Sequence, residues 1–130
     1  FIVDGQPVEK RIVGGLLGHW AVWTRKAVEL LEEIKQIRNE ARLEARWLTR
    51  NVEVTDTNAA FFDPAHQFAG CIPGIHEVLR RQGLLEGIWC LDPNEGLSPG
   101  QAELISAVAQ RYPHLTDDAF VRDNLHRWLS

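Results

Sequence analysis

Apolar residues recur at steps of three and four along five separate segments of this chain. That spacing places them on one side of an α-helix, because the helix completes a turn every 3.6 residues. The clearest case is the segment 19–38, whose apolar residues are Trp20, Trp23, Ala27, Leu30, Leu31, Ile34 and Ile37. Charged residues take the other side. Two tryptophans on one side carry a large apolar area, so we expect this helix to pack against another part of a protein.

A second helix is predicted after a break at Asn39-Glu40. It covers residues 41–62 and ends at Asp63-Pro64, because the residue before a proline disfavours helical backbone. A short strand at residues 51–54 is the alternative for part of this segment, since two valines alternate there. The preceding run of arginine, glutamate, alanine and leucine has high helix propensity and favours the helix.

A third helix is predicted over residues 72–82, with Pro73 in its first turn and Gly83 at its end. The following residues, 84–97, contain Gly87, Pro93 and Gly96 and are predicted to form a loop. Five apolar residues of this loop indicate that it lies packed along a surface; they are Leu84, Leu85, Ile88, Trp89 and Leu91.

The fourth helix has the most complete start signal of the sequence. Ser98 is predicted as its N-cap, Pro99 as its first residue and Gln101 as the partner that completes a capping box. Pro113 ends it. A fifth helix is predicted to begin at Thr116 or Asp117, where acidic residues in the first turn suit the helix dipole.

Residues 1–18 form the least helical segment. Phe1–Val3 is β-prone, and Asp4-Gly5 is a turn signal. Ile12-Val13 leads into the glycine-rich run 14–18, which predicts one strand or a loop. This run lacks the spacing of a dinucleotide-binding loop, so we interpret it as a glycine-rich lead into a helix. The predicted fold class is mostly α, with about five helices and one N-terminal strand.

Composition restricts the class of protein. The chain has 130 residues, enough for one domain, and we expect a single helical unit over residues 1–130, with 1–18 as an edge segment or loop and 19–130 as the helical region. A net charge of −4 argues against a nucleic-acid partner, which would need clustered lysine and arginine. No apolar run is long enough to span a membrane. Cys71 and Cys90 are expected to be free thiols, which favours a cytoplasmic location.

Several residues are candidates for chemistry. His66, Cys71, His76 and Cys90 are potential metal ligands, but their spacings of 5, 5 and 14 are not those of a zinc site. His76-Glu77 begins a zinc-protease motif that fails because position 80 is arginine. Cys71, near a helix start, is a possible nucleophile with His66 or His76 as its base. Its apolar neighbours favour a packed thiol instead.

Two further groups have ordinary structural interpretations. Arg80-Arg81 could bind an anion, but a solvated helix end is the preferred interpretation. His19, Trp20 and Trp23 could line a ligand site, although such a stripe is more often core or subunit interface. The sequence therefore assigns no catalytic, cofactor-binding or metal-binding residue.

Two stretches carry a recognisable order of motifs. The first is TNAAFFDP (57–64) followed by FAGCIPGIHEVLRRQGLL (68–85), and the second is WCLDPNE (89–95) followed by LSPGQ (97–101). Together they resemble the C-terminal part of bacterial proteins of the dihydrodipicolinate synthase / N-acetylneuraminate lyase family. The resemblance covers about Leu16 to Leu129. It implies the last helix and the C-terminal helical extension of a (β/α)8 TIM barrel.

The resemblance also implies a function for a parent protein. Members of this family are aldolase-type lyases that form a Schiff base between a lysine and pyruvate or a related 2-oxo acid. None of the residues that do this carries over to this chain: Lys10, Lys26, Lys35 and Tyr112 do not match the family's motif. The absence of methionine and the start at Phe1 suggest a fragment of a longer polypeptide.

We therefore expect a catalytically inactive part that closes the barrel and helps to build a homo-oligomer, with no cofactor of its own. A non-catalytic helical interaction module is the alternative. A small enzyme that uses Cys71 is a third hypothesis.

Overall fold

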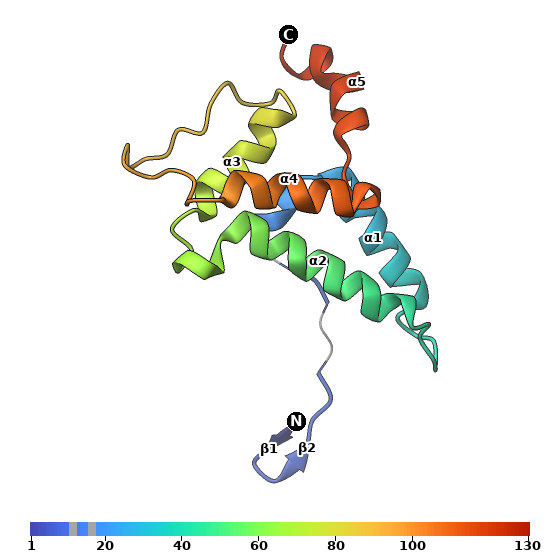
Figure 1. Ribbon diagram of the computed structural model, residues 1–130. Helices are drawn as coiled ribbons and strands as arrows, with labels where there is room; N and C mark the ends of the chain where they lie inside the picture. The colour runs from blue at the N-terminus through green and yellow to red at the C-terminus, as the bar shows by residue number, and fades with distance from the viewer. Residues whose placement is uncertain (11–12, 16–17) are drawn as a thin grey trace.

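The computed structural model describes residues 1–10, 13–15 and 18–130 (Figure 1). The described part is mostly helical, as predicted. Its α-helices are α1 (Thr24–Ile37), α2 (Arg46–Phe62), α3 (Cys71–Arg81), α4 (Gln101–Arg111) and α5 (Asp118–Trp128). Short 3-10 helices are η1 (Gly18–Ala21), η2 (Pro64–His66) and η3 (Pro113–Leu115). Two short strands, β1 (Ile2–Val3) and β2 (Gln6–Pro7), lie near the N-terminus.

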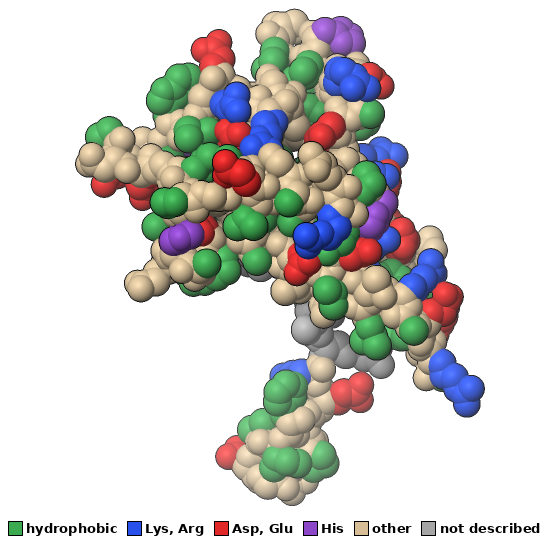
Figure 2. All heavy atoms as spheres, in the orientation of Figure 1, with side chains coloured by type: hydrophobic (Ala, Val, Ile, Leu, Met, Phe, Trp, Pro, Cys, Tyr) green, Lys and Arg blue, Asp and Glu red, His purple; other side chains and the backbone are tan. Residues whose placement is uncertain are grey.

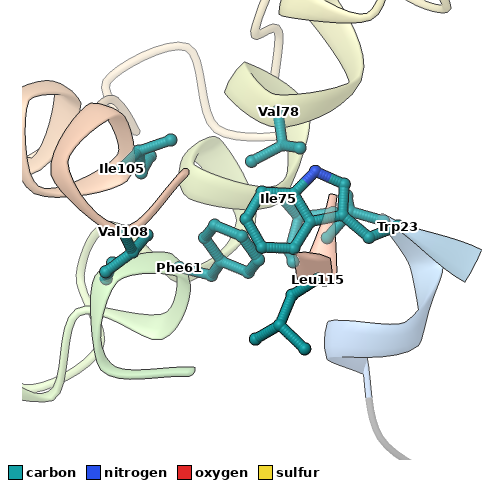
Figure 3. Close-up of a cluster of buried hydrophobic side chains, with 9 residues drawn as sticks. Trp23, Phe61, Ile75, Val78, Ile105, Val108 and Leu115 are labelled. Carbon is teal, nitrogen blue, oxygen red and sulfur yellow. The ribbon is translucent and has the colours of Figure 1, made fainter. Parts of the chain in front are cut away.

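The core lies where α2, α3 and α4 pack together (Figure 1). Figure 3 shows its buried side chains, with the indole of Trp23 at the centre of the cluster. Trp23 meets Phe61 of α2 edge to face, with the ring centroids 5.1 Å apart. The described core residues are Val22, Trp23, Ala60, Phe61, Ile75, Val78, Ile105, Val108 and Leu115. For His19, Trp20 and Trp23 the sequence favoured core or subunit interface over a ligand site. The structure places His19 and Trp23 in the interior.

The two N-terminal strands form an antiparallel hairpin. Ile2 pairs with Pro7 and Val3 with Gln6. Asp4 and Gly5, at the turn, both have positive φ, 50° and 75°, as the tightest hairpin turns require. The β-prone start and the turn signal were thus interpreted correctly, but two strands form where we predicted one. The expected strand or loop at Ile12-Val13 and the glycine-rich run lie partly outside the described residues, which omit positions 11–12 and 16–17.

The first two helices start at different residues than predicted. The first predicted helix is divided into η1 and α1, because Trp23 adopts a left-handed backbone (φ 49°) that turns its ring into the core. The second begins at Arg46, five residues later than predicted. Residues 41–46 are all exposed, so no packing adds to their helix propensity. The alternative strand at residues 51–54 is wrong, since this segment lies inside α2.

The start of α4 corrects the predicted capping box. The helix begins at Gln101, after Gly100 in a left-handed conformation (φ 80°). The backbone N–H of Ser98 does donate to the Gln101 side chain, at 3.1 Å. In a capping box the serine oxygen would accept from a backbone N–H of the first turn, but α4 has Gly100 at its N-cap and no side-chain cap. The Ser98 hydroxyl instead donates to the buried carboxylate of Asp63, and hydrogen bonds to an ionised acceptor are the stronger kind.

The loop of residues 84–97 is only partly packed. Leu84, Leu85 and Ile88 are half-buried, which agrees with the prediction. Trp89 and Leu91 contradict it, because Trp89 is 70% exposed and Leu91 fully exposed. No helix among the described residues is both long and apolar enough to cross a membrane.

Candidate functional site

The motif residues at the ends of α2, α3 and α4 meet in one buried polar cluster, which we name the Asp63 junction. Its members are Asp63, Gly70, Gly74, Ser98 and Gln101, and all but Ser98 are buried. Asp63 accepts hydrogen bonds from the Ser98 hydroxyl at 2.5 Å and from the backbone N–H of Gly70 at 3.1 Å. Its other oxygen lies 2.6 Å from Nδ1 of His66.

The ionised form of Asp63 is held in place by these bonds. Burial by itself would raise the pKa of Asp63, but hydrogen bonds from Ser98, His66 and Gly70 outweigh burial, so the pKa lies below its ordinary value. The order Ser–Asp–His differs from that of a hydrolytic triad, in which the histidine stands between the serine and the acid. Ser98 therefore bonds to the carboxylate directly and has no imidazole base between itself and the acid.

Gln101 fills the other half of the Asp63 junction. Its amide nitrogen donates to the carbonyl oxygens of Gly70, at 2.9 Å, and of Ala60 and Phe61, both at 3.3 Å. The carbonyls of Ala60 and Phe61 lie in the last turn of α2, where backbone acceptors lack partners within the helix. The Gly70 carbonyl, at the start of α3, also accepts from the backbone N–H of Gly74 at 2.8 Å. The junction thus holds three elements together and presents no free reactive group.

No hydrogen bond joins Cys71 to His66 or to His76 among the described residues, so the third hypothesis of the sequence, a Cys71 nucleophile, gains no support. Burial raises the pKa of the Cys71 thiol, which makes a thiolate less available. His66 is paired with Asp63, and His76 lies beside Cys90, with Nδ1 and Sγ 4.0 Å apart. Burial also raises the pKa of Cys90, and the carboxylates of Glu95 and Asp92 add to this effect.

Neither a disulfide nor a metal centre is found in the described part of the chain. Cys71 and Cys90 are both free, as predicted. No group of three or more potential metal ligands comes together among the described residues.

Arg80 and Arg81 do not form a free cationic end. Both guanidinium groups bind Glu77, at 2.7 Å each. Arg81 also donates to Ser106 and to the carbonyl oxygen of Ala102, which ties α3 to α4. Hydrogen bonds from Arg80 and then Arg81 hold the pKa of the buried Glu77 below its ordinary value. Both residues are exposed in the last turn of α3, as predicted for a solvated helix end, and their bonds to Glu77 and to α4 are an additional role that the sequence did not predict.

Lys10 and Lys35 are exposed and Lys26 is half-buried, whereas Tyr112 is half-buried and packs against the core. Lys26 pairs with Glu29 and Lys35 with Glu32, at 2.8 and 2.7 Å. Schiff-base chemistry needs a desolvated amine in an enclosed site, which none of these offers. The hydroxyl of Tyr112 donates to Asp56, and this bond raises the pKa of Tyr112.

Two shallow hollows flank the helices. One, of about 190 Å³, lies between α1 and α2 and is lined in part by Trp47, Arg50, Glu53 and His114. Glu53 binds both His114 and Arg50, at 2.8 and 3.2 Å, so these three polar side chains of the hollow are already paired with one another. The other, of about 480 Å³, lies between α1 and α5 beside Arg25 and Phe120. The Arg25 guanidinium stacks over Phe120, 5.4 Å from its ring centroid.

The most distinctive surface feature is uncovered apolar area. Helix α1 has an apolar stripe yet contributes no buried residue, and Val28, Leu31 and Ile34 are 52%, 44% and 41% exposed. Helix α2 buries one side in the core and exposes Leu48 and Val52 on the other. Figure 2 shows hydrophobic side chains spread over the visible face of the helices. Apolar faces of this kind mark contact surfaces for other proteins.

Sequence reasoning missed the roles of Asp63, Glu77, Gln101 and Asp117. Asp63 looked like a helix stop and Gln101 like a capping partner. Their long-range partners lie 31 to 41 residues away in the sequence, and no local pattern encodes such pairs.

Comparison with known proteins gives no further guide. No family model, no curated protein and no solved structure matches this chain.

Proposed function

We propose that this chain is the helical assembly part of a lyase of the dihydrodipicolinate synthase / N-acetylneuraminate lyase type, and that it covers a barrel without carrying the reaction. The observation that supports this is α1, an amphipathic helix none of whose residues is fully buried in the described chain. Helices of α/β proteins lay such a stripe on a sheet. The motif runs from Thr57 to Gln101 supply the resemblance, and they build the Asp63 junction that fixes α2, α3 and α4.

The reaction itself would take place on residues of the parent outside this chain. In a parent of this type, the amine of a buried lysine would condense with the carbonyl of a 2-oxo acid with loss of water, and the iminium would take up the electron pair of the carbon–carbon bond that breaks. The described residues would support such a site structurally. None of them would take part in the reaction. This is consistent with Lys26 and Lys35 being engaged in surface ion pairs.

Reductive trapping tests the proposal. The polypeptide encoded by the gene is incubated with pyruvate and borohydride and then digested for mass spectrometry. We expect an adduct on a lysine outside residues 1–130. An adduct on Lys10, Lys26 or Lys35, or the absence of any adduct, would contradict the proposal.

A non-catalytic helical interaction module is the second candidate. The compact core of α2, α3 and α4, with its own polar junction, favours it, because this part needs no partner to be packed. Trapping separates the two candidates: a module gives no adduct in any polypeptide that contains it. Both candidates place the function on the exposed apolar faces.

A further inference from the structure

Two exposed apolar surfaces of the chain carry opposite charge. We name residues 35–50, from the last turn of α1 to the first turn of α2, the tip. We name residues 84–97, between α3 and α4, the strap. The tip has five basic and two acidic residues, whereas the strap has three acidic residues and no basic one. Both surfaces present large apolar side chains to solvent.

The strap is shaped as a protruding knob. Leu91 is fully exposed and Trp89 is 70% exposed. The indole of Trp89 lies against Gly87, where an added Cβ would come within 2.9 Å of the ring. Beside Leu91, the side chain of Asp92 accepts from the backbone N–H of Asn94 at 2.9 Å, which closes a tight turn. A preorganised knob loses little entropy when it binds.

The tip presents an apolar surface with a basic rim. Leu43 and Leu48 are 60% and 74% exposed. Arg38 and Arg42 form no ion pair with any described residue. Arg46 makes an exposed ion pair with Glu44 at 3.1 Å, and its guanidinium lies over the Trp47 ring, 5.7 Å from the centroid. The acidic groups around Trp89 and Leu91 are Glu86, Asp92 and Glu95.

The tip and the strap of one copy do not meet. Figure 1 shows the strap at the upper left and the tip at the lower right, with α2 and α4 between them. Figure 2 shows acidic side chains at the strap end and basic ones at the tip end. A contact between the two surfaces therefore has to join different copies, head to tail.

We infer that the strap of one copy docks on the tip of a second copy of this chain. Leu91 and Trp89 bury against Leu43 and Leu48, and the strap carboxylates face Arg38 and Arg42. Opposite charges across such an interface select the partner and speed association. The inference rests on the proposed function in assembly and specifies its partner.

Sedimentation velocity of the whole 130-residue chain, over a range of protein and salt concentrations, tests the inference. We expect the mass to increase with concentration and association to weaken at high salt, because salt screens exposed charges. Arg38→Glu with Arg42→Glu, or Glu86→Lys with Glu95→Lys, should each raise the dissociation constant roughly tenfold or more, since each puts like charges together. Mixing these two variants should restore association between them.

Two controls separate docking from loss of fold. Arg122→Glu with Arg127→Glu makes the same charge change on exposed α5 and should leave association unchanged. Leu91→Ser removes a fully exposed side chain, so circular dichroism should be unaltered while association weakens.

The failures are distinguishable. A chain that stays monomeric at all concentrations would overturn the head-to-tail contact. An oligomer whose dissociation constant is unchanged by both charge reversals would also overturn it. Neither result alters the lysine-trapping outcome, which decides the proposed function.

Discussion

At the scale of single residues, Gly74 leaves no room for a side chain. A Cβ there would lie 2.2 Å from the carbonyl oxygen of Phe61 and 2.6 Å from the Gln101 amide. The first neighbour is backbone and cannot move aside, so Gly74→Ala should lower the free energy of unfolding by about 1–3 kcal/mol or more. Urea unfolding measures it. Gly96→Ala is the control, since nothing lies within 4 Å of that Cβ, and an equal loss in both variants would contradict the argument.

The lowered pKa of Asp63 predicts how the stability of the fold depends on pH. Its folded pKa is below the ordinary value, so its ionised form stabilises the fold above the unfolded pKa of about 3.9. That stabilisation is lost as pH falls through the folded pKa. Urea midpoints between pH 7 and pH 2.5 should therefore decrease in acid, and Asp63→Asn should flatten the decrease. The pKa of Glu77 is lowered too, so part of the dependence of the urea midpoint on pH should persist in Asp63→Asn. An unchanged slope in Asp63→Asn would count against the role of the junction.

At the scale of elements, the N-terminus of α1 is stabilised from a distance. The carboxylate of Asp117 accepts from the backbone N–H of Arg25 at 2.9 Å and from the Gln82 amide at 2.8 Å. Loss of such a cap costs about 0.5–2 kcal/mol. Asp117→Ala should thus speed hydrogen exchange in α1 more than in α2. Asp123→Ala, whose carboxylate has only a loose exposed contact, should leave both helices unchanged.

The same scale shows what the sequence can predict. Periodicity predicted all five helices, and Asp63-Pro64 and Gly83 predicted two of the helix ends, because these signals are local. The bond of Asp63 to Ser98 and the cap of α1 by Asp117 could not be predicted, since the partners are 35 and 92 residues apart. The start of α2 was predicted too early for a related reason. Residues 41–45 have helix propensity, but no tertiary contact stabilises a helix there. The sequence therefore showed the motifs that contain the residues of the Asp63 junction, but only the structure shows that these residues contact one another.

At the scale of the whole molecule, the described chain consists of a packed centre and loosely attached outer helices. Helices α2, α3 and α4 supply most of the core, whereas α1 buries no residue and α5 buries only Val121. Ile105→Ala should cost about 2–5 kcal/mol of unfolding free energy, because Ile105 is fully buried. Leu31→Ser should change it by less than about 0.5 kcal/mol, because Leu31 is exposed in this chain.

This contrast distinguishes fold from contact surface. In a parent whose barrel covers α1, Leu31 is buried, so Leu31→Ser should there cost what a core substitution costs. Denaturation of both polypeptides, each with and without Leu31→Ser, measures the difference. A large loss in the 130-residue chain itself would mean that α1 is already packed in solution. An equally small loss in the parent would mean that α1 faces solvent there too, and that its apolar stripe serves some contact other than the barrel.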